Sequence, residues 1–115
     1  MRPTFHLIPT EAWTQRDLAA PIVAPSLVGE GFIHCTDGPT AMVVTADRHY
    51  RTDPRDFTIL TVDLDATGSP WRFDDPERRF PHIYGPIDPA AVLDAVPIAR
   101  REDGTFIAFS AGGAF

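Results

Sequence analysis

The sequence predicts an α+β fold, and three observations support this prediction. The segment 56–64 (DFTILTVDL) is rich in β-branched residues and alternates with the period of a strand. Three segments that begin at a helix-start signal, 10–20, 39–50 and 89–96, mix with short strand-like segments in no regular strand–helix–strand repeat. The 12 prolines and 8 glycines are spread along the 115 residues, so the elements should be short and tightly connected.

The first elements are a strand and a helix. The stretch FHLI (5–8) favours a short strand that Pro9 ends. Thr10 favours a helix N-cap, with the helix running to about Ala20. The prolines that follow then favour an extended connection past Pro25.

A second strand and a second helix complete the first half of the chain. The stretch FIHCT (32–36) follows two glycines and predicts a compact strand. Pro39 favours a first helical turn, and apolar residues at helical spacing, Met42 and Ala46 among them, extend this helix to about Tyr50.

The second half begins with the clearest strand, 56–64. A loop over 65–79 follows, which a short strand at 71–73 interrupts, and then the strand HIY (82–84). Asp88-Pro89 is a cap and first-turn signal for a short helix to Val96. The turn Asp103-Gly104 between PIARR and TFIAF predicts a closing hairpin.

Length and composition restrict the class of protein. We expect one domain over residues 1–115, large enough to bury a core without disulfides, and the single cysteine, Cys35, fits a reducing compartment. No apolar run or leader-like segment is present, which predicts a cytoplasmic protein without a membrane span. The net charge of −6 makes broad nucleic-acid binding unfavourable, although a single nucleotide in a local pocket remains compatible with it.

The stretch FPHIYGPI (80–87) is the first candidate for a site. Strand geometry places His82 and Tyr84 on one face and Ile83 on the other. If Ile83 packs inward, both polar rings face a surface or a cleft. In FIHCT the same geometry separates His34 from Cys35, which argues against a Cys–His nucleophile pair and makes Cys35 a small buried residue.

Three histidines, His6, His34 and His82, occupy separate predicted strands, each beside large apolar residues. They either converge on one pocket, where imidazole supplies hydrogen bonds at neutral pH, or are independent core and surface residues. A zinc site is the competing use of three histidines, but no local ligand pair such as HxH or HExxH occurs. His49 belongs to the predicted helix 39–50, and we expect it on the solvated face.

The carboxylates give weaker signals. Asp37 favours a helix cap before Pro39, and Asp63 ends the clearest strand, where it could approach a cleft. The charged run DDPERR (74–79) is typical of a solvated loop. Arg79, next to Phe80, could still reach an anionic ligand from this loop.

The stretches FHLI, APSL, EGFIHCT, ILTVDL and FPHIYGPI, taken together, resemble the bacterial family called "domain of unknown function 952". The resemblance covers about residues 5–106. This family is grouped by remote similarity with the ADP-ribosyltransferase-like superfamily, which includes the RNA 2′-phosphotransferases. The resemblance therefore implies a compact α+β domain with a split, strongly curved, mixed or antiparallel sheet and an NAD-binding cleft.

The superfamily builds its site from three separated motifs, and the resemblance carries them to histidines of this chain. His6 would hold a ribose hydroxyl, His34 would form the middle motif, and His82 with Tyr84 would form the third. Tyr84 would stack on a nicotinamide or another base. Glutamate-dependent transferases carry a glutamate in the third motif, and FPHIYGP offers none, so the resemblance supports the pocket more than the reaction.

The sequence thus leaves three hypotheses. The first is a transferase-like domain whose cleft binds NAD or another nucleotide or phosphate compound, as a glycosyl- or phosphotransferase with no tightly bound cofactor. The second is a non-catalytic module that binds a small ligand in the same cleft. The third is a hydrolase whose three histidines hold a metal. The candidate catalytic residues are His6, His34 and His82, and the candidate ligand-binding residues are Tyr84, Phe32, Ser26 and Arg79. The oligomeric state stays open.

Overall fold

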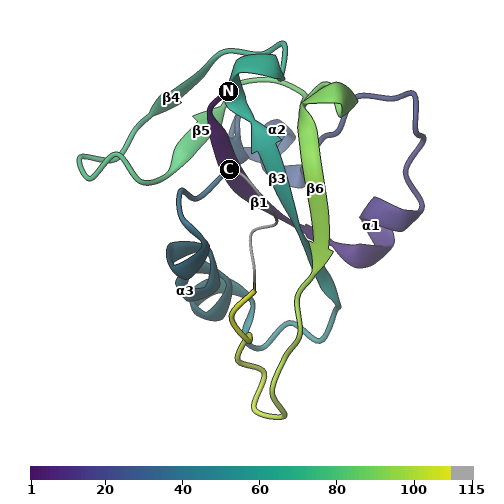
Figure 1. Cartoon of the computed structure of the whole chain (residues 1–115), viewed down its shortest axis with the longest axis vertical. Coiled ribbons are helices and arrows are strands. Elements are labelled where there is room, and N and C mark those ends of the chain that lie inside the picture. Colours follow the sequence, from purple (N-terminus) through teal and green to yellow (C-terminus); the bar gives the residue numbers. More distant parts are fainter. Residues whose placement is uncertain (110–115) are drawn as a thin grey trace.

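A three-stranded antiparallel sheet forms the centre of the molecule (Figure 1). In the computed structural model, which describes residues 1–109, its strands are β1 (Pro3–Pro9), β3 (Phe57–Asp63) and β6 (Val92–Pro97), in the order β1-β3-β6. Because β3 lies in the middle, both of its faces are covered, and all of its residues except Asp63 are buried. The segment 56–64 was predicted to be a strand, and this is confirmed.

A second, smaller antiparallel sheet contains β2 (Ile33–His34), β5 (Pro81–Ile83) and β4 (Trp71–Phe73), in the order β2-β5-β4. An isolated antiparallel bridge between Phe5 and Thr36 connects it to β1. The described strands therefore form two antiparallel sheets, which fits the expected split sheet. The short strand predicted at 71–73 is present as β4.

Three α-helices accompany the sheets: α1 (Thr10–Thr14), α2 (Pro25–Gly29) and α3 (Pro39–Tyr50). The prediction of α3 is confirmed at both ends, and Gly38 precedes it with a φ of 89°, a conformation that favours glycine.

The first helix was predicted to reach about Ala20, and this is wrong. It ends at Thr14, after which the carboxylate of Asp17 accepts a bond from the amide of Ala19 and stabilises a turn. Leu18 is 74% exposed, so no apolar stripe supports a longer helix here. Helix α2 was not predicted. Pro25 occupies its first turn, where the missing N–H costs nothing.

The helix predicted from Pro89 to Val96 is also wrong. The side chain of Asp88 does accept a bond from the amide of Ala90, but it starts only a 3₁₀ turn, Pro89–Ala91. The chain then enters β6, because the edge of β3 offers an antiparallel ladder, with one register shift between Thr61 and Val62, in which Val92 and Val96 pair. A local start signal cannot anticipate this tertiary partner.

Two apolar clusters pack on opposite faces of the central sheet. One lies toward the small sheet and includes Leu60, Val62, Ile33 and Ile83. The other lies under α3 and includes Phe57, Ile59, Met42, Ala46 and Phe106. The alternation predicted for β3 is therefore real, but it separates two cores instead of a core from solvent.

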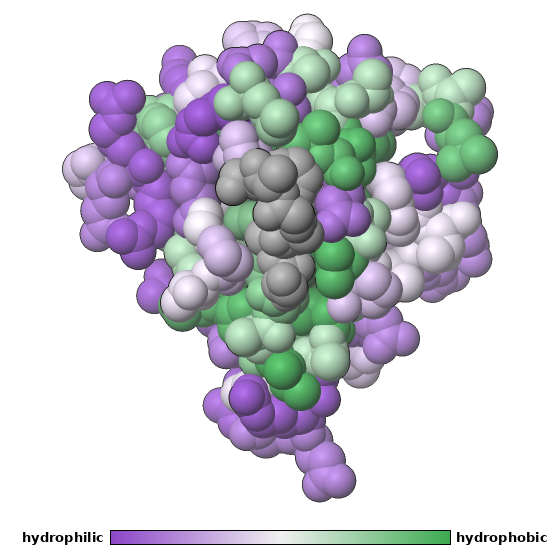
Figure 2. Space-filling view, viewed as in Figure 1, coloured by the Kyte–Doolittle hydropathy of each residue, from purple (hydrophilic) through white to green (hydrophobic). Residues whose placement is uncertain are grey.

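The chain after β6 forms the predicted hairpin, with Gly104 in the turn at a φ of 88° and one bridge between Arg100 and Phe106. This hairpin and the β4–β5 hairpin carry mostly hydrophilic side chains, while apolar side chains gather toward the middle of the same face (Figure 2). Within residues 1–109, no helix has the length and apolar character that a membrane crossing requires. The last six residues of the predicted domain 1–115 lie outside the described residues.

Candidate functional site

A cleft of about 1390 Å³ follows the edge of β1. Its floor contains residues 5–10, one wall comes from α3, and the other comes from α1 and the start of α2. The β4–β5 hairpin closes one end with Asp74, Asp75, Phe80 and His82. A volume of this size accommodates a small-molecule ligand.

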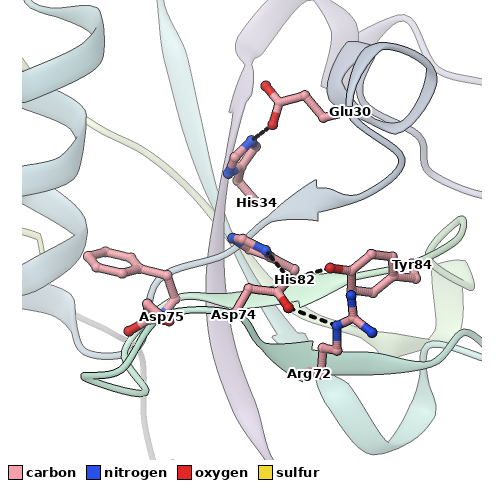
Figure 3. A network of polar contacts seen from close by, with 8 residues as sticks. Glu30, His34, Arg72, Asp74, Asp75, His82 and Tyr84 are labelled. Atoms are coloured by element: carbon pink, nitrogen blue, oxygen red, sulfur yellow. Dashed lines mark hydrogen bonds and ion pairs between the residues drawn. The ribbon is translucent and has the colours of Figure 1, made fainter.

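His82 belongs to a polar network at this end of the cleft that is centred on Asp74 (Figure 3). Its Nδ1 lies 2.8 Å from Oδ2 of Asp74, the residue that follows β4. The same carboxylate accepts a hydrogen bond from the hydroxyl of Tyr84 and one of 2.8 Å from Nε of Arg72. These partners, Tyr84 first, lower the pKa of Asp74 to about 2, so Asp74 stays anionic at neutral pH.

The orientation of this pair follows from strand alternation. Ile83 is fully buried in the core, while His82 and Tyr84 both turn to the other side and meet Asp74. The predicted division of FPHIYGPI into an inner residue and two outer rings is confirmed. The hydrogen bond to the anionic Asp74 also raises the pKa of Tyr84, so the phenol keeps its proton.

His34 forms a second carboxylate–histidine pair. Its Nε2 lies 2.7 Å from Oε2 of Glu30, and both side chains are about half exposed. Because β2 and β5 place His34 directly opposite His82, the two imidazole centroids are 5.3 Å apart. Phe32 lies against both rings, stacked on His82 at 4.0 Å and edge-on to His34 at 4.9 Å.

His6 reaches the same place from β1. It is buried, and its Nδ1 lies 2.7 Å from the backbone carbonyl oxygen of His34. Since a carbonyl only accepts, Nδ1 carries the proton and Nε2 keeps a lone pair. Burial lowers the pKa of His6, so the ring is neutral at pH 7.

The three histidines share one arrangement. Each has one ring nitrogen engaged by a protein acceptor: a backbone oxygen for His6, Glu30 for His34 and Asp74 for His82. All three line the cleft. Such outer partners fix the tautomer of a ring and leave its second nitrogen for a ligand.

The other predicted residues take different positions. Ser26 lines the cleft from α2, whereas Phe32 and Tyr84 support His82 without belonging to the cleft lining. The side chain of Arg79 is exposed and also lies outside the lining. Its backbone serves instead to fold the loop, through an N–H bond to Asp75.

Two residues of the site were missed by the sequence reasoning. Asp74 was assigned to a solvated loop, but the β4–β5 pairing sets Arg72 opposite His82 and so brings Asp74 beside the imidazole. The strand predicted at 71–73 could have revealed the position of Asp74 if it had been paired with the predicted strand HIY (82–84). Glu30 gave no signal, because the turn after α2 brings it to His34.

Three further interpretations have clear outcomes. Asp37 is not a helix cap, because its carboxylate accepts bonds from Arg2 and Thr4 and thus ties β1 to the start of α3. His49 is exposed on α3, as expected, although it lines the far end of the cleft. Cys35 is buried, and burial raises the pKa of its thiol, as expected for an unreactive residue.

Carboxylates outnumber guanidinium groups in the cleft. The acidic residues that line it are Glu11, Glu30, Asp56, Asp74 and Asp75, and the basic ones are Arg48 and Arg55. Three of these acids, Glu30, Asp74 and Asp75, belong to the histidine end, where the guanidinium of Arg72 is bonded to Asp74 (Figure 3). This end therefore favours a neutral or cationic group over a phosphate. Among residues 1–109, no group of three His, Cys, Asp or Glu side chains has the geometry to hold a metal ion.

Comparison with a family model decides the relationship. The model described as "Protein of unknown function (DUF952)" matches residues 7–95. The chain belongs to this family. The link of the family to the ADP-ribosyltransferase-like superfamily stays a prediction.

Two solved structures resemble this member of the family. They are protein CC0527 from Caulobacter crescentus and a double mutant of that protein, each 19% identical in sequence with a TM-score of 0.73. Each likeness covers 91% of this chain and 93% of the other, and it shows a shared fold. No curated protein matches the chain.

Proposed function

We propose that the cleft binds a nucleotide-like small molecule, with NAD as the first candidate, and that its histidine end is a site of glycosyl transfer. The observation that carries this proposal is the meeting of His6, His34 and His82, from three strands, at one end of one cleft. The superfamily relationship predicted from the sequence would agree with it.

The binding roles follow from the free ring nitrogens. The lone pair on Nε2 of neutral His6 accepts a bond from a ligand hydroxyl, such as that of a ribose. Nδ1 of His82 donates to Asp74, so Nε2 of His82 is the basic nitrogen that faces a ligand. Phe32 stacks on His82 and fixes the plane of this ring.

The carboxylates favour glycosyl transfer over phosphoryl transfer. A glycosyl transition state develops positive charge on the sugar, and Asp74 and Glu30 supply negative charge next to the imidazoles. The charge that FPHIYGP lacks thus comes from two other segments. A phosphoryl group would need free guanidinium groups at this end, and the guanidinium of Arg72 is already bonded to Asp74.

The proposed step for NAD breaks the bond between ribose C1′ and the nicotinamide nitrogen, and the bonding electron pair stays with that nitrogen. An acceptor oxygen, from water or from a second substrate, forms the new bond to C1′. Nε2 of His82 takes the proton that this oxygen loses. Charge and atoms balance without a metal or a redox partner.

Binding is tested by thermal-shift titration with NAD, ADP-ribose and nucleoside phosphates. A ligand that binds the folded state alone raises the melting temperature. The absence of a shift with every compound at millimolar concentration would refute a nucleotide cleft. His82→Ala should remove the shift, while Leu18→Ala, at an exposed position outside the cleft lining, should retain it.

Release of nicotinamide from NAD separates an enzyme from a binding module. If NAD binds and no nicotinamide is released with water or added acceptors, the non-catalytic hypothesis replaces transfer. Metal analysis of the purified protein tests the third hypothesis. One equivalent of zinc that is lost in His34→Ala and His82→Ala would establish a metal site and overturn glycosyl transfer.

A further inference from the structure

The outer edge of β1 offers main-chain hydrogen-bonding groups to the cleft. Among the strands of residues 1–109, β1 is an edge strand, paired with β3 on one side only. At Phe5 the other side is occupied, because its N–H donates to the carbonyl oxygen of Thr36 at 3.0 Å and its own carbonyl accepts from Thr36 at 2.8 Å. The groups of Phe5 thus point away from β3.

The alternation of residues along β1 then determines the direction in which the main-chain N–H and C=O groups of the following residues point. In an antiparallel ladder, the N–H and C=O of every second residue point to the same side. The groups of Leu7 therefore point outward, as those of Phe5 do, while Thr10 points inward and donates to Asp56 at 2.8 Å. Within residues 1–109, neither main-chain group of Leu7 has a hydrogen-bond partner outside the ladder.

This free pair lies on the floor of the cleft. Leu7 is partly exposed and lines it, between α3 on one side and residues 23–26 on the other. Pro3 and Pro9 flank the position along β1, and each lacks an N–H. One residue of the edge, Leu7, thus presents both a donor and an acceptor to whatever enters the cleft.

The charge of the walls restricts what can enter. Five carboxylates and two guanidinium groups line the cleft, and the whole chain has a net charge of −6. A strand that pairs with Leu7 would have its side chains between these walls. Cationic side chains complement this excess of carboxylates better than anionic side chains do.

We propose that an extended, basic peptide segment binds in this cleft by adding a strand to the free edge of β1 at Leu7. One peptide residue exchanges both main-chain hydrogen bonds with Leu7, as Thr36 does with Phe5. Its neighbours place arginine or lysine side chains toward the carboxylates on the α1 and α2 side of the cleft and at its β4–β5 end. This interaction goes beyond the glycosyl transfer proposed above and does not depend on it.

The test uses a capped pentapeptide that alternates valine and arginine, titrated into the ¹⁵N-labelled protein. Two matched peptides serve as controls: one has glutamate in place of arginine, and the other carries an N-methyl group on the central residue. We expect the arginine peptide to shift the Leu7 amide signal in a saturable, salt-sensitive way. The loss of one main-chain hydrogen bond should weaken the N-methyl peptide by about tenfold.

Two protein variants test the same contact from the other side. Leu7→Pro removes the outward N–H and no bond to β3, whereas Leu7→Ala keeps the N–H and removes the side chain. Leu7→Pro should bind the arginine peptide about tenfold more weakly than Leu7→Ala. If Leu7→Pro does not fold, binding of the N-methyl peptide to the wild-type protein tests the same main-chain contact.

Five results would overturn the proposal: equal binding of the N-methyl peptide, equal binding of the glutamate peptide, no saturable binding by any peptide, a dimer that Leu7→Pro dissociates, or a shift of Leu7 with benzamide alone. The last would assign the edge to a small carboxamide. A dimer that Leu7→Pro dissociates would assign it to a second copy of the chain.

Discussion

The neutral, buried state of His6 predicts how the stability of the protein depends on pH. Burial lowers the pKa of this ring below its ordinary value of 6.5. Below pH 6.5 the unfolded chain therefore binds a proton at His6 that the folded protein does not bind. The free energy of unfolding must fall as the pH falls through this range.

The magnitude follows from one proton. Between the unfolded and folded pKa values, a single group contributes a slope of up to about 1.4 kcal/mol per pH unit. For a domain of this size, that corresponds to a melting temperature lower by about 4–6 °C per pH unit. The useful window runs from pH 6.5 to about pH 5, above the range in which carboxylates begin to bind protons.

The perturbation is His6→Gln, which keeps a polar side chain at this position but does not titrate. Urea unfolding of the wild type and the variant at several pH values gives the two slopes. The variant should lose most of the dependence between pH 6.5 and about pH 5, whereas His49→Gln, which removes an exposed histidine, should keep it. Only the slope enters the comparison, because the substitution also changes packing. An unchanged slope in His6→Gln would refute a neutral, buried His6.

Three further predictions concern other parts of the molecule. Asp74 has a folded pKa of about 2, so its bonds stabilise the fold above pH 3.8 and are lost as the pH falls toward 2. The stability of Asp74→Asn should therefore change less than that of the wild type over this pH range. An identical acid-unfolding transition in the two proteins would contradict this prediction. Gly104→Ala should destabilise the protein by about 1–3 kcal/mol in urea, since the left-handed turn brings a new Cβ onto the carbonyl of Arg51, and an unchanged midpoint would exclude this strain. Cys35 should react with iodoacetamide only in denaturant, because burial raises the pKa of its thiol, and fast native labelling would contradict its burial.

Much of the local structure could be predicted because the signals are local. Helix α3 has a proline in its first turn, glycine before it and apolar residues at helical spacing, and it was predicted with the observed ends. The residues of β3 alternate over seven positions. The segments that were predicted wrongly, after Thr14 and after Ala91, depend on tertiary contacts. Leu18 is exposed and does not pack in a core, and Val92 pairs with the edge of β3.

The candidate site likewise contains residues that local sequence signals could place and residues that only tertiary contacts place. Alternation within FPHIYGPI sufficed to place His82 and Tyr84 on one face and Ile83 in the core. It could not supply Asp74 or Glu30, because each reaches its histidine through a turn whose direction depends on packing. Only the tertiary structure could therefore show whether other segments supply the negative charge that the third motif lacks.

By itself the sequence determined an α+β domain with histidines on three short strands, since strand period, proline position and apolar spacing act over a few residues. The tertiary structure decided that these histidines share one cleft and that two carboxylates hold two of them. It also decided that Leu7 presents to that cleft a main-chain N–H and C=O without a partner among residues 1–109. These features join segments up to tens of residues apart. They depend on the pairing of β1, β2, β4 and β5, which no single stretch of the sequence determines.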